Sequence, residues 1–227
     1  MLEKKRVKTV NTEFLQKYYT YLFSPHVPIH AKNENFTFRR ATKEDEDRIL
    51  AFLNEEGKKK DFFPVIKSIQ QFTNLKVTDF YLLMDKDEIV ATGAIWNQMG
   101  YRQYIVTNYH GIIKVAKYFN PLLKKLGYMQ LPPRDKMIDY RMLSFFISKN
   151  EKEAYTMAFL KDITQEIKNK NDLFIVGALE NSQLNHLLKK LRNIHFDSQI
   201  YGVEFLFKNN KNVEVNQENL YLECGLL

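Results

Sequence analysis

The sequence is poor in cysteine and has no long apolar run, and each of these absences excludes a class of protein. A single cysteine, Cys224, rules out a disulfide within the chain and a cysteine-based metal cluster. The five histidines show no metal-type spacing, so no metal site is expected. No segment approaches the ~18 uninterrupted apolar residues of a membrane span, and the basic N-terminus has no apolar stretch behind it. We therefore expect neither a secreted nor a membrane-spanning protein, and a cytoplasmic location.

The composition does support a core. Of the 227 residues, 44% are hydrophobic and 14% aromatic, which suits one sizeable domain with an appendage. The 34 basic residues outnumber the 27 acidic ones, for a net charge of +7. This excess favours an anionic partner: a phosphate-bearing cofactor, nucleic acid or a membrane surface.

The segment from Met142 to Lys168 organises the chain. Residues 142–147 form a nearly continuous apolar run, which is typical of a central strand covered on both faces. From about Glu151 onward, apolar residues recur at steps of three and four, which predicts an amphipathic helix. The junction would present unpaired backbone N–H groups and the positive end of the helix dipole, which together favour an anion.

The N-terminal part predicts a helix and a linker. Apolar side chains fall on one helical face before two prolines interrupt the pattern: Phe14, Leu15, Tyr18, Tyr19 and Leu22. Such an aromatic, basic helix would pack on the neighbouring domain or touch a membrane.

The next segments predict one strand, two helical stretches and a hairpin. Residues 36–41 alternate as a strand, and Thr42 with the acids that follow it starts a helix that ends near Gly57. A second helical stretch is expected over 65–75, behind Pro64. Residues 79–84 and 88–96 then read as a β-hairpin.

Residues 97–140 are expected to form an insertion with one helix over 111–126, which ends at Gly127. The remaining predictions are a buried strand over 173–178, a helix over 182–191 capped by Asn181, strand segments from 195 to 207 broken near Gly202, a loop over 209–219 and an edge strand over 220–223.

In this order the chain resembles the GCN5-related N-acetyltransferase (GNAT) superfamily over about residues 36–208, and within it a poorly characterised bacterial subgroup. The segments that carry the resemblance are Phe62–Val65, Gly93–Gln98, Arg102–Val106 with Tyr109, and Leu131–Pro133 ahead of Leu143–Phe145. It implies an α/β fold with a mixed, mostly antiparallel central sheet flanked by helices, an N-terminal helix and a helical insertion. The expected division is 1–34 for the helix and linker, 35–208 for the acyltransferase domain with its insertion at 99–139, and 209–227 for a tail.

The resemblance also implies a cofactor, acetyl-CoA or another acyl-CoA, at the junction of strand and helix, where main-chain N–H groups hold the diphosphate. The residues expected to bind it are Phe146, Ile147, Ser148, Lys152, Glu153, Ala154, Tyr155, Thr156 and Asn181. Ala154 and Thr156 stand where glycines are usual, which crowds the backbone. Glu151 and Glu153 would repel a diphosphate, and Lys149 and Lys152 offset part of this repulsion.

In the superfamily an amine attacks the thioester, a strand N–H polarises the carbonyl, and a tyrosine protonates the leaving thiolate. That tyrosine falls near Leu188 in this chain, which has no proton to give. From position alone, the substitute candidates are Tyr155, His186 and Tyr201.

A polar and aromatic cluster follows the hairpin: Trp96, Gln98, Arg102, Gln103 and Tyr109. It reads either as a pocket for a polar or carboxylate-bearing acceptor or as a strand end that ties the insertion to the sheet.

The leading hypothesis is an N-acyltransferase that moves an acetyl or acyl group from CoA to an amine of a small molecule or peptide. The alternatives are a transferase that uses an aminoacyl-tRNA donor, whose phosphates the basic chain would bind, and a binding protein that kept the fold without the chemistry. A further hypothesis is peripheral membrane association through the helix at 111–126.

Overall fold

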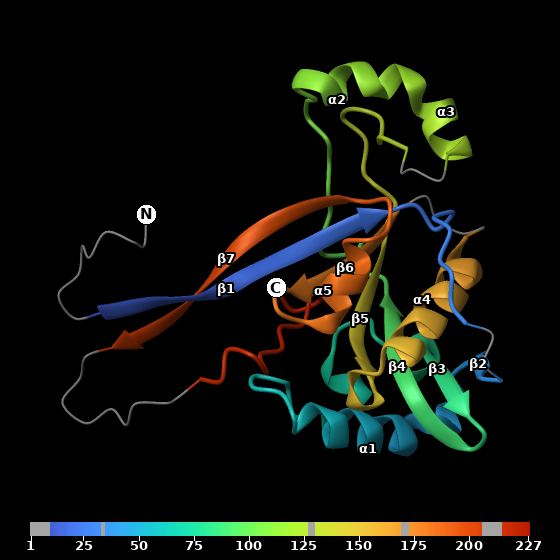
Figure 1. Cartoon of the computed structure of the whole chain (residues 1–227), viewed down its shortest axis with the longest axis vertical. Helices are drawn as coiled ribbons and strands as arrows, with labels where there is room; N and C mark the ends of the chain where they lie inside the picture. Colours follow the sequence, from blue (N-terminus) through green and yellow to red (C-terminus); the bar gives the residue numbers. More distant parts are fainter. Residues whose placement is uncertain (1–9, 33–34, 127–129, 169–172, 206–214) are drawn as a thin grey trace.

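A computed structural model of the protein describes residues 10–32, 35–126, 130–168, 173–205 and 215–227. Its centre is a seven-stranded sheet in the order β2-β3-β4-β5-β6-β1-β7 (Figure 1). The strands are β1 (Val10–Phe23), β2 (Thr37–Arg40), β3 (Phe80–Asp85), β4 (Glu88–Trp96), β5 (Arg141–Ser148), β6 (Phe174–Leu179) and β7 (Ile194–Phe205). Every neighbouring pair is antiparallel except β5 and β6, so the predicted mixed, mostly antiparallel sheet is confirmed.

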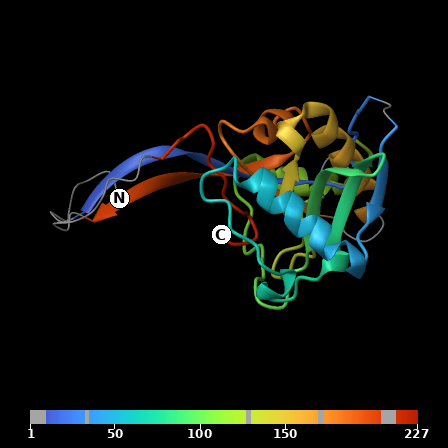
Figure 2. The same ribbon diagram turned by 90° about the horizontal axis from the view of Figure 1, so that it is seen from below.

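Helices cover both faces of this sheet. On one face lie α4 (Glu153–Ile167) and α5 (Gln183–Leu188), and on the other α1 (Glu46–Gly57), as Figure 2 shows from below. A hydrophobic core lies on each face of the sheet, and each strand contributes to both cores because successive side chains point to opposite faces. In β3, for example, Leu83 packs toward α4 while Leu82 packs toward α1. The sheet is therefore buried on both sides at its centre, as the apolar run at 142–147 predicts.

The predicted N-terminal helix is wrong. Residues 10–23 form β1, which pairs with β6 through Tyr18–Phe23 and with β7 along most of its length. Aromatic and β-branched residues dominate this segment, and they fit the pleated surface of a strand between two neighbours. Within this strand Tyr18 and Tyr21 are buried in the cores that the sheet packs against.

On the N-terminal side of Tyr18, β1 pairs with β7 alone, and the two strands form a two-stranded arm that leaves the rest of the sheet. Residues 10–17 of β1 pair with β7 but not with β6, and both views show this arm extending away from the body (Figures 1 and 2). We call it the β1–β7 arm. The predicted break near Gly202 is also wrong, because β7 runs through this glycine, with Gly202 opposite Glu13.

Several predicted elements are confirmed and two change. The hairpin is β3–β4, the helix that follows β5 is α4, and residues 46–57 form α1. The expected helix over 65–75 is only a 3-10 turn at Ile69–Gln71, and the expected edge strand over 220–223 is a single bridge between Leu220 and Asp61.

The insertion helix is present as α2 (Gly111–Ala116) and α3 (Asn120–Lys125), joined by a 3-10 turn, and the two lie at one end of the molecule in Figure 1. Its predicted end at Gly127, the strand end at 206–207, the loop at 209–214 and the basic segment before Val10 lie outside the described residues. The predicted division into 1–34, 35–208 and 209–227 stays a prediction.

Candidate functional site

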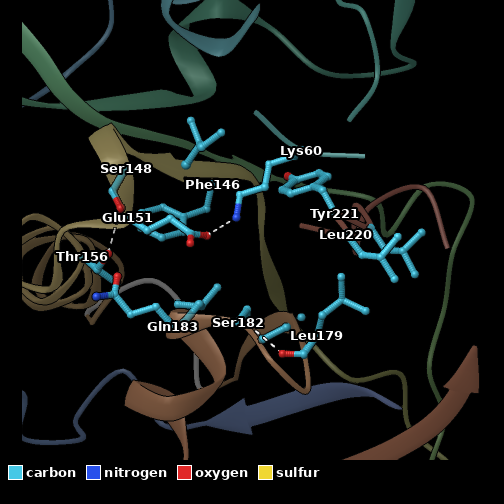
Figure 3. A pocket seen from close by; sticks show the side chains of 15 residues that line it. Lys60, Phe146, Ser148, Glu151, Thr156, Leu179, Ser182, Gln183, Leu220 and Tyr221 are labelled. Carbon is cyan, nitrogen blue, oxygen red and sulfur yellow. Dashed lines mark hydrogen bonds and ion pairs between the residues drawn. The ribbon is translucent and has the colours of Figure 1, made fainter. Parts of the chain in front are cut away.

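A cleft opens where β5 and β6 separate. The two strands pair in parallel only between Arg141–Leu143 and Phe174–Val176, and beyond this point they diverge. The space between them is a cleft that is open to solvent (Figure 3). It is lined by Phe146, Ile147 and Ser148 of β5, by Gly177, Ala178 and Leu179 of β6, by Ser182, Gln183 and Leu184 near α5, and by Lys60, Glu151, Thr156, Leu220, Tyr221 and Leu222.

A bulge in β5 causes the separation. The register between β4 and β5 shifts between Thr92 and Ala94, so that two residues of β5, Phe145 and Phe146, lie opposite Gly93. Phe145 has a φ of 52°, a left-handed conformation that bends the strand. Its N–H donates at 2.6 Å to a carboxylate oxygen of Glu223, which comes from the C-terminal tail. The bulge therefore directs a backbone N–H to a side chain beside the cleft.

Glu223 is buried, and all of its donors are neutral. Its Oε2 accepts from the Phe145 N–H and, at 2.6 Å, from the Tyr221 hydroxyl, while its Oε1 accepts from the Gly225 N–H at 2.8 Å. Burial raises the pKa of Glu223 above its ordinary value, and these hydrogen bonds oppose the rise. Burial, followed by the neighbouring Glu223 carboxyl, raises the pKa of Tyr221 well above its ordinary value. The Tyr221 phenol therefore stays protonated at neutral pH.

The loop between β5 and α4 is partly occupied by side chains. The N–H of Asn150 donates to Glu56 Oε2 at 3.0 Å, and Lys60 pairs with Glu151 at 2.5 Å across the cleft mouth, as Figure 3 shows for the latter pair. At the start of α4, the N–H groups of residues 155 and 156 both turn back to the carbonyl of Lys152. Of residues 149–154, Glu151 alone lines the cleft.

Four of the predicted cofactor residues line the cleft: Phe146, Ile147, Ser148 and Thr156. Ser148 Oγ and Thr156 Oγ1 are hydrogen-bonded at 2.9 Å, which ties the end of β5 to α4. The other five do not line it: Lys152, Glu153, Ala154, Tyr155 and Asn181. The expected cap by Asn181 is wrong, because Ser182 Oγ accepts the Asn185 N–H and caps α5.

None of the three catalytic candidates lines the cleft. Tyr155 packs edge-on against Phe36, with the Lys152 ammonium 4.5 Å from its ring centre. His186 is exposed on α5, and Tyr201 lies on the β1–β7 arm, where its hydroxyl donates to Gln199. Leu188, near which the resemblance places the superfamily's tyrosine, is fully buried in the core. The catalytic role of Tyr155, His186 and Tyr201 stays a prediction.

The predicted acceptor cluster lies outside the cleft, and its side chains donate to backbone carbonyls. Gln98 and Arg102 reach the tail at Gly225 and Cys224, which fastens the segment that carries Glu223. The other three bonds run from Trp96 to Thr73, from Gln103 to Met99 and from Tyr109 to Pro132. Gln98 and Arg102 thus tie the insertion to the tail, and the bonds of Gln103 and Tyr109 lie within the insertion. The substrate-binding role of this cluster stays a prediction.

Sequence reasoning missed three residues that line the cleft, Lys60, Gln183 and Tyr221, and it missed Glu223, which is hydrogen-bonded to Tyr221. The oxygen of the Gln183 amide is buried without a hydrogen-bond partner in the described part of the chain. The tail did carry one signal, since the spacing of Tyr221 and Glu223 puts both on one face of an extended segment. Nothing local showed that this segment reaches β5, 78 residues away in the sequence.

Among the residues that the structure describes, no group of three or more His, Cys, Asp or Glu side chains is placed to hold a metal ion. Within the same residues, no helix is long and apolar enough to cross a membrane.

Comparison with known proteins gives the fold. No family model matches the sequence, and no curated protein matches it. Among solved structures, a GCN5-related N-acetyltransferase from Anabaena variabilis superposes with a TM-score of 0.51 at 10% identity, over 87% of this chain and 42% of that one. A conserved protein of unknown function from Staphylococcus epidermidis gives 0.49 at 9% identity, over 88% of this chain and 65% of that one. This chain thus has a GNAT-like fold and spans less than half of the Anabaena structure.

Proposed function

We propose that the protein is an N-acyltransferase that binds an acyl-CoA in the cleft between β5 and β6 and transfers the acyl group to an amine. The observation that carries this proposal is the cleft itself, formed by the Phe145 bulge on a GNAT-like fold. The lining fits the thiol end of the cofactor. Its walls are largely apolar, and the unpartnered oxygen of Gln183 suits an amide N–H of the pantetheine arm.

Bound acyl-CoA would supply the thioester whose carbonyl carbon an amine attacks, forming a C–N bond and breaking the C–S bond. The Phe145 N–H would polarise the carbonyl once Glu223 has moved from it. The freed Glu223 would accept the proton that the amine loses, and Tyr221 would donate its proton to the sulfur. The proton on Glu223 would then return to the Tyr221 oxygen across their hydrogen bond, which restores both groups. A neutral phenol held beside the cleft by burial suits this role better than the exposed His186.

Binding is tested by titrating the protein with CoA and acetyl-CoA, by calorimetry and by thermal shift. We expect Gln183→Trp to fill the cleft and weaken binding more than tenfold. His186→Trp is the matched control, because this residue is exposed on the same helix and lies outside the cleft. No heat and no thermal shift with wild-type protein would contradict the proposal.

The diphosphate position has its own test. We propose that the diphosphate lies against the loop at 150–154, where the Glu151 carboxylate is a repulsive neighbour. Glu151→Gln should then tighten CoA binding several-fold, and most strongly at low salt. It should not change the affinity for a pantetheine fragment that lacks the diphosphate. If Glu151→Gln changed the affinity for CoA and for the pantetheine fragment equally, the proposed position of the diphosphate would be contradicted.

A binding protein without chemistry is the second candidate, and two observations favour it. Glu223 occupies the bulge N–H, and Leu188 stands where the superfamily's acid would be. This candidate predicts CoA binding without turnover across a panel of amines and acyl-CoAs. Turnover by the wild-type protein that Tyr221→Phe reduces would favour the N-acyltransferase over the binding protein.

A further inference from the structure

The insertion carries a set of exposed apolar side chains. Val115, Phe119, Leu122 and Leu126 follow steps of four, three and four residues, which align side chains along one side of a helix. Together with Tyr118 they are between 48 and 81% exposed. We call these five residues the outer stripe.

The opposite side of the insertion holds it to the protein. Asn120 exchanges two hydrogen bonds of 2.9 Å with the backbone of Leu131, and Ala116 packs on the core near Leu131. The half-buried positions Ala116, Asn120 and Leu123 thus form the fixed side of the insertion. Figure 1 shows α2 and α3 at one end of the molecule, beyond the sheet.

Charge indicates what covers the stripe. Residues 111–126 contain four lysines and no acidic residue. Lys114 and Lys125 are exposed on α2 and α3. A second copy of the chain would bring two such lysine sets together, and their repulsion opposes that contact. An apolar, aromatic stripe beside lysines instead matches the boundary between lipid headgroups and acyl chains of an anionic bilayer.

We propose that the insertion docks this protein on the surface of an anionic lipid bilayer, with the outer stripe in the interface and the lysines against the headgroups. Phe119 and Leu122 supply apolar area, while Lys114 and Lys125 supply attraction that depends on salt. The contact is peripheral and leaves the β5–β6 cleft free, so it is independent of the proposed acyltransferase activity.

The test is flotation of the full chain with vesicles of phosphatidylcholine alone and with vesicles that also contain phosphatidylglycerol. We expect binding to the anionic vesicles only, weakened by high salt. The double variant Phe119→Ser with Leu122→Ser should reduce binding at least tenfold. Lys114→Gln with Lys125→Gln should reduce it roughly tenfold and remove much of the salt dependence. Phe196→Ser, which removes an exposed aromatic on β7, is the matched control and should bind as wild type.

Three outcomes would overturn the proposal. The first is no flotation with anionic vesicles, and the second is flotation that the stripe variants leave unchanged. The third is a concentration-dependent dimer, seen by sedimentation, that Phe119→Ser with Leu122→Ser abolishes, which would assign the stripe to a second copy of the chain. All variants change exposed side chains, so circular dichroism and the melting temperature should match wild type and confirm that they fold.

Discussion

Asp45 and Glu223 are both buried carboxylates, and their surroundings differ in kind. Asp45, ahead of α1, accepts two hydrogen bonds from the Arg39 guanidinium, at 2.7 and 2.6 Å, and one from the Thr42 N–H at 2.8 Å. These bonds, the Arg39 pair first, hold the pKa of Asp45 well below its ordinary value. Asp45 therefore stabilises the fold as an anion.

Glu223 has the reverse environment. Its donors are two backbone N–H groups and the Tyr221 phenol, and burial raises its pKa. Keeping this carboxylate ionised costs stability, since none of the described residues places a cation in contact with it to offset the loss of water. A buried carboxyl that costs stability beside a cleft is typical of a functional site, whereas a fully paired one is typical of a structural anchor. Four substitutions test this difference between the two carboxyl groups.

Asp45→Asn should have the largest effect, a loss of about 3 kcal/mol in the free energy of unfolding at neutral pH, because it removes the charge that Arg39 pairs with. A carboxyl with a depressed pKa stabilises the fold above its unfolded pKa of about 3.9 and loses this contribution on acidification. The deficit of the variant should therefore shrink below about pH 4. Urea unfolding from neutral to acidic pH measures this, and a constant deficit would contradict it.

Glu223→Gln should cost about 1 to 2 kcal/mol, because one acceptor oxygen is replaced by a donor. Its pH dependence should run the other way. A carboxyl with a raised pKa contributes stability below its unfolded pKa, of about 4.3, and loses it as the pH rises through the folded value. The deficit should be largest near pH 4 and shrink toward neutral pH. A deficit that grows toward neutral pH would show that Glu223 is stabilised as an anion, like Asp45.

Tyr221→Phe should cost about 1 kcal/mol, the usual value for one lost hydrogen bond. It should also raise the pKa of Glu223 further, because one donor to the carboxylate is removed. The shift is visible as a move of the stability–pH curve to higher pH. Tyr201→Phe, whose hydroxyl bonds Gln199 in an exposed position, is the control and should leave the curve in place.

Arg39→Lys should have the smallest effect, about 0.5 to 1 kcal/mol, because an ammonium keeps the charge beside Asp45 but not the paired geometry. Thermal unfolding at low and high salt measures it. If the loss equals that of Asp45→Asn, the paired hydrogen bonds and not the charge carry the stability of this anchor.

Sequence reasoning succeeded where the signal is local. The turn at residues 85–87 defines the β3–β4 hairpin, and the change from a continuous apolar run to three- and four-residue spacing marks the junction of β5 and α4. It failed at β1, since the spacing of Phe14, Leu15 and Tyr18 suits a helix and only pairing with distant strands makes the segment extended. The cleft depends in the same way on the tail, whose position beside β5 has no local signature.

The position of β1 between β6 and β7 has a consequence for how this chain is made. Its partners lie at residues 174–179 and 194–205, so they leave the ribosome more than 150 residues after β1 does. At typical rates of synthesis this delay is on the order of ten seconds. Throughout that time an aromatic strand of 14 residues lacks both native neighbours, and intermolecular pairing competes with folding. Nascent-chain folding should therefore be completed only after β7 has emerged.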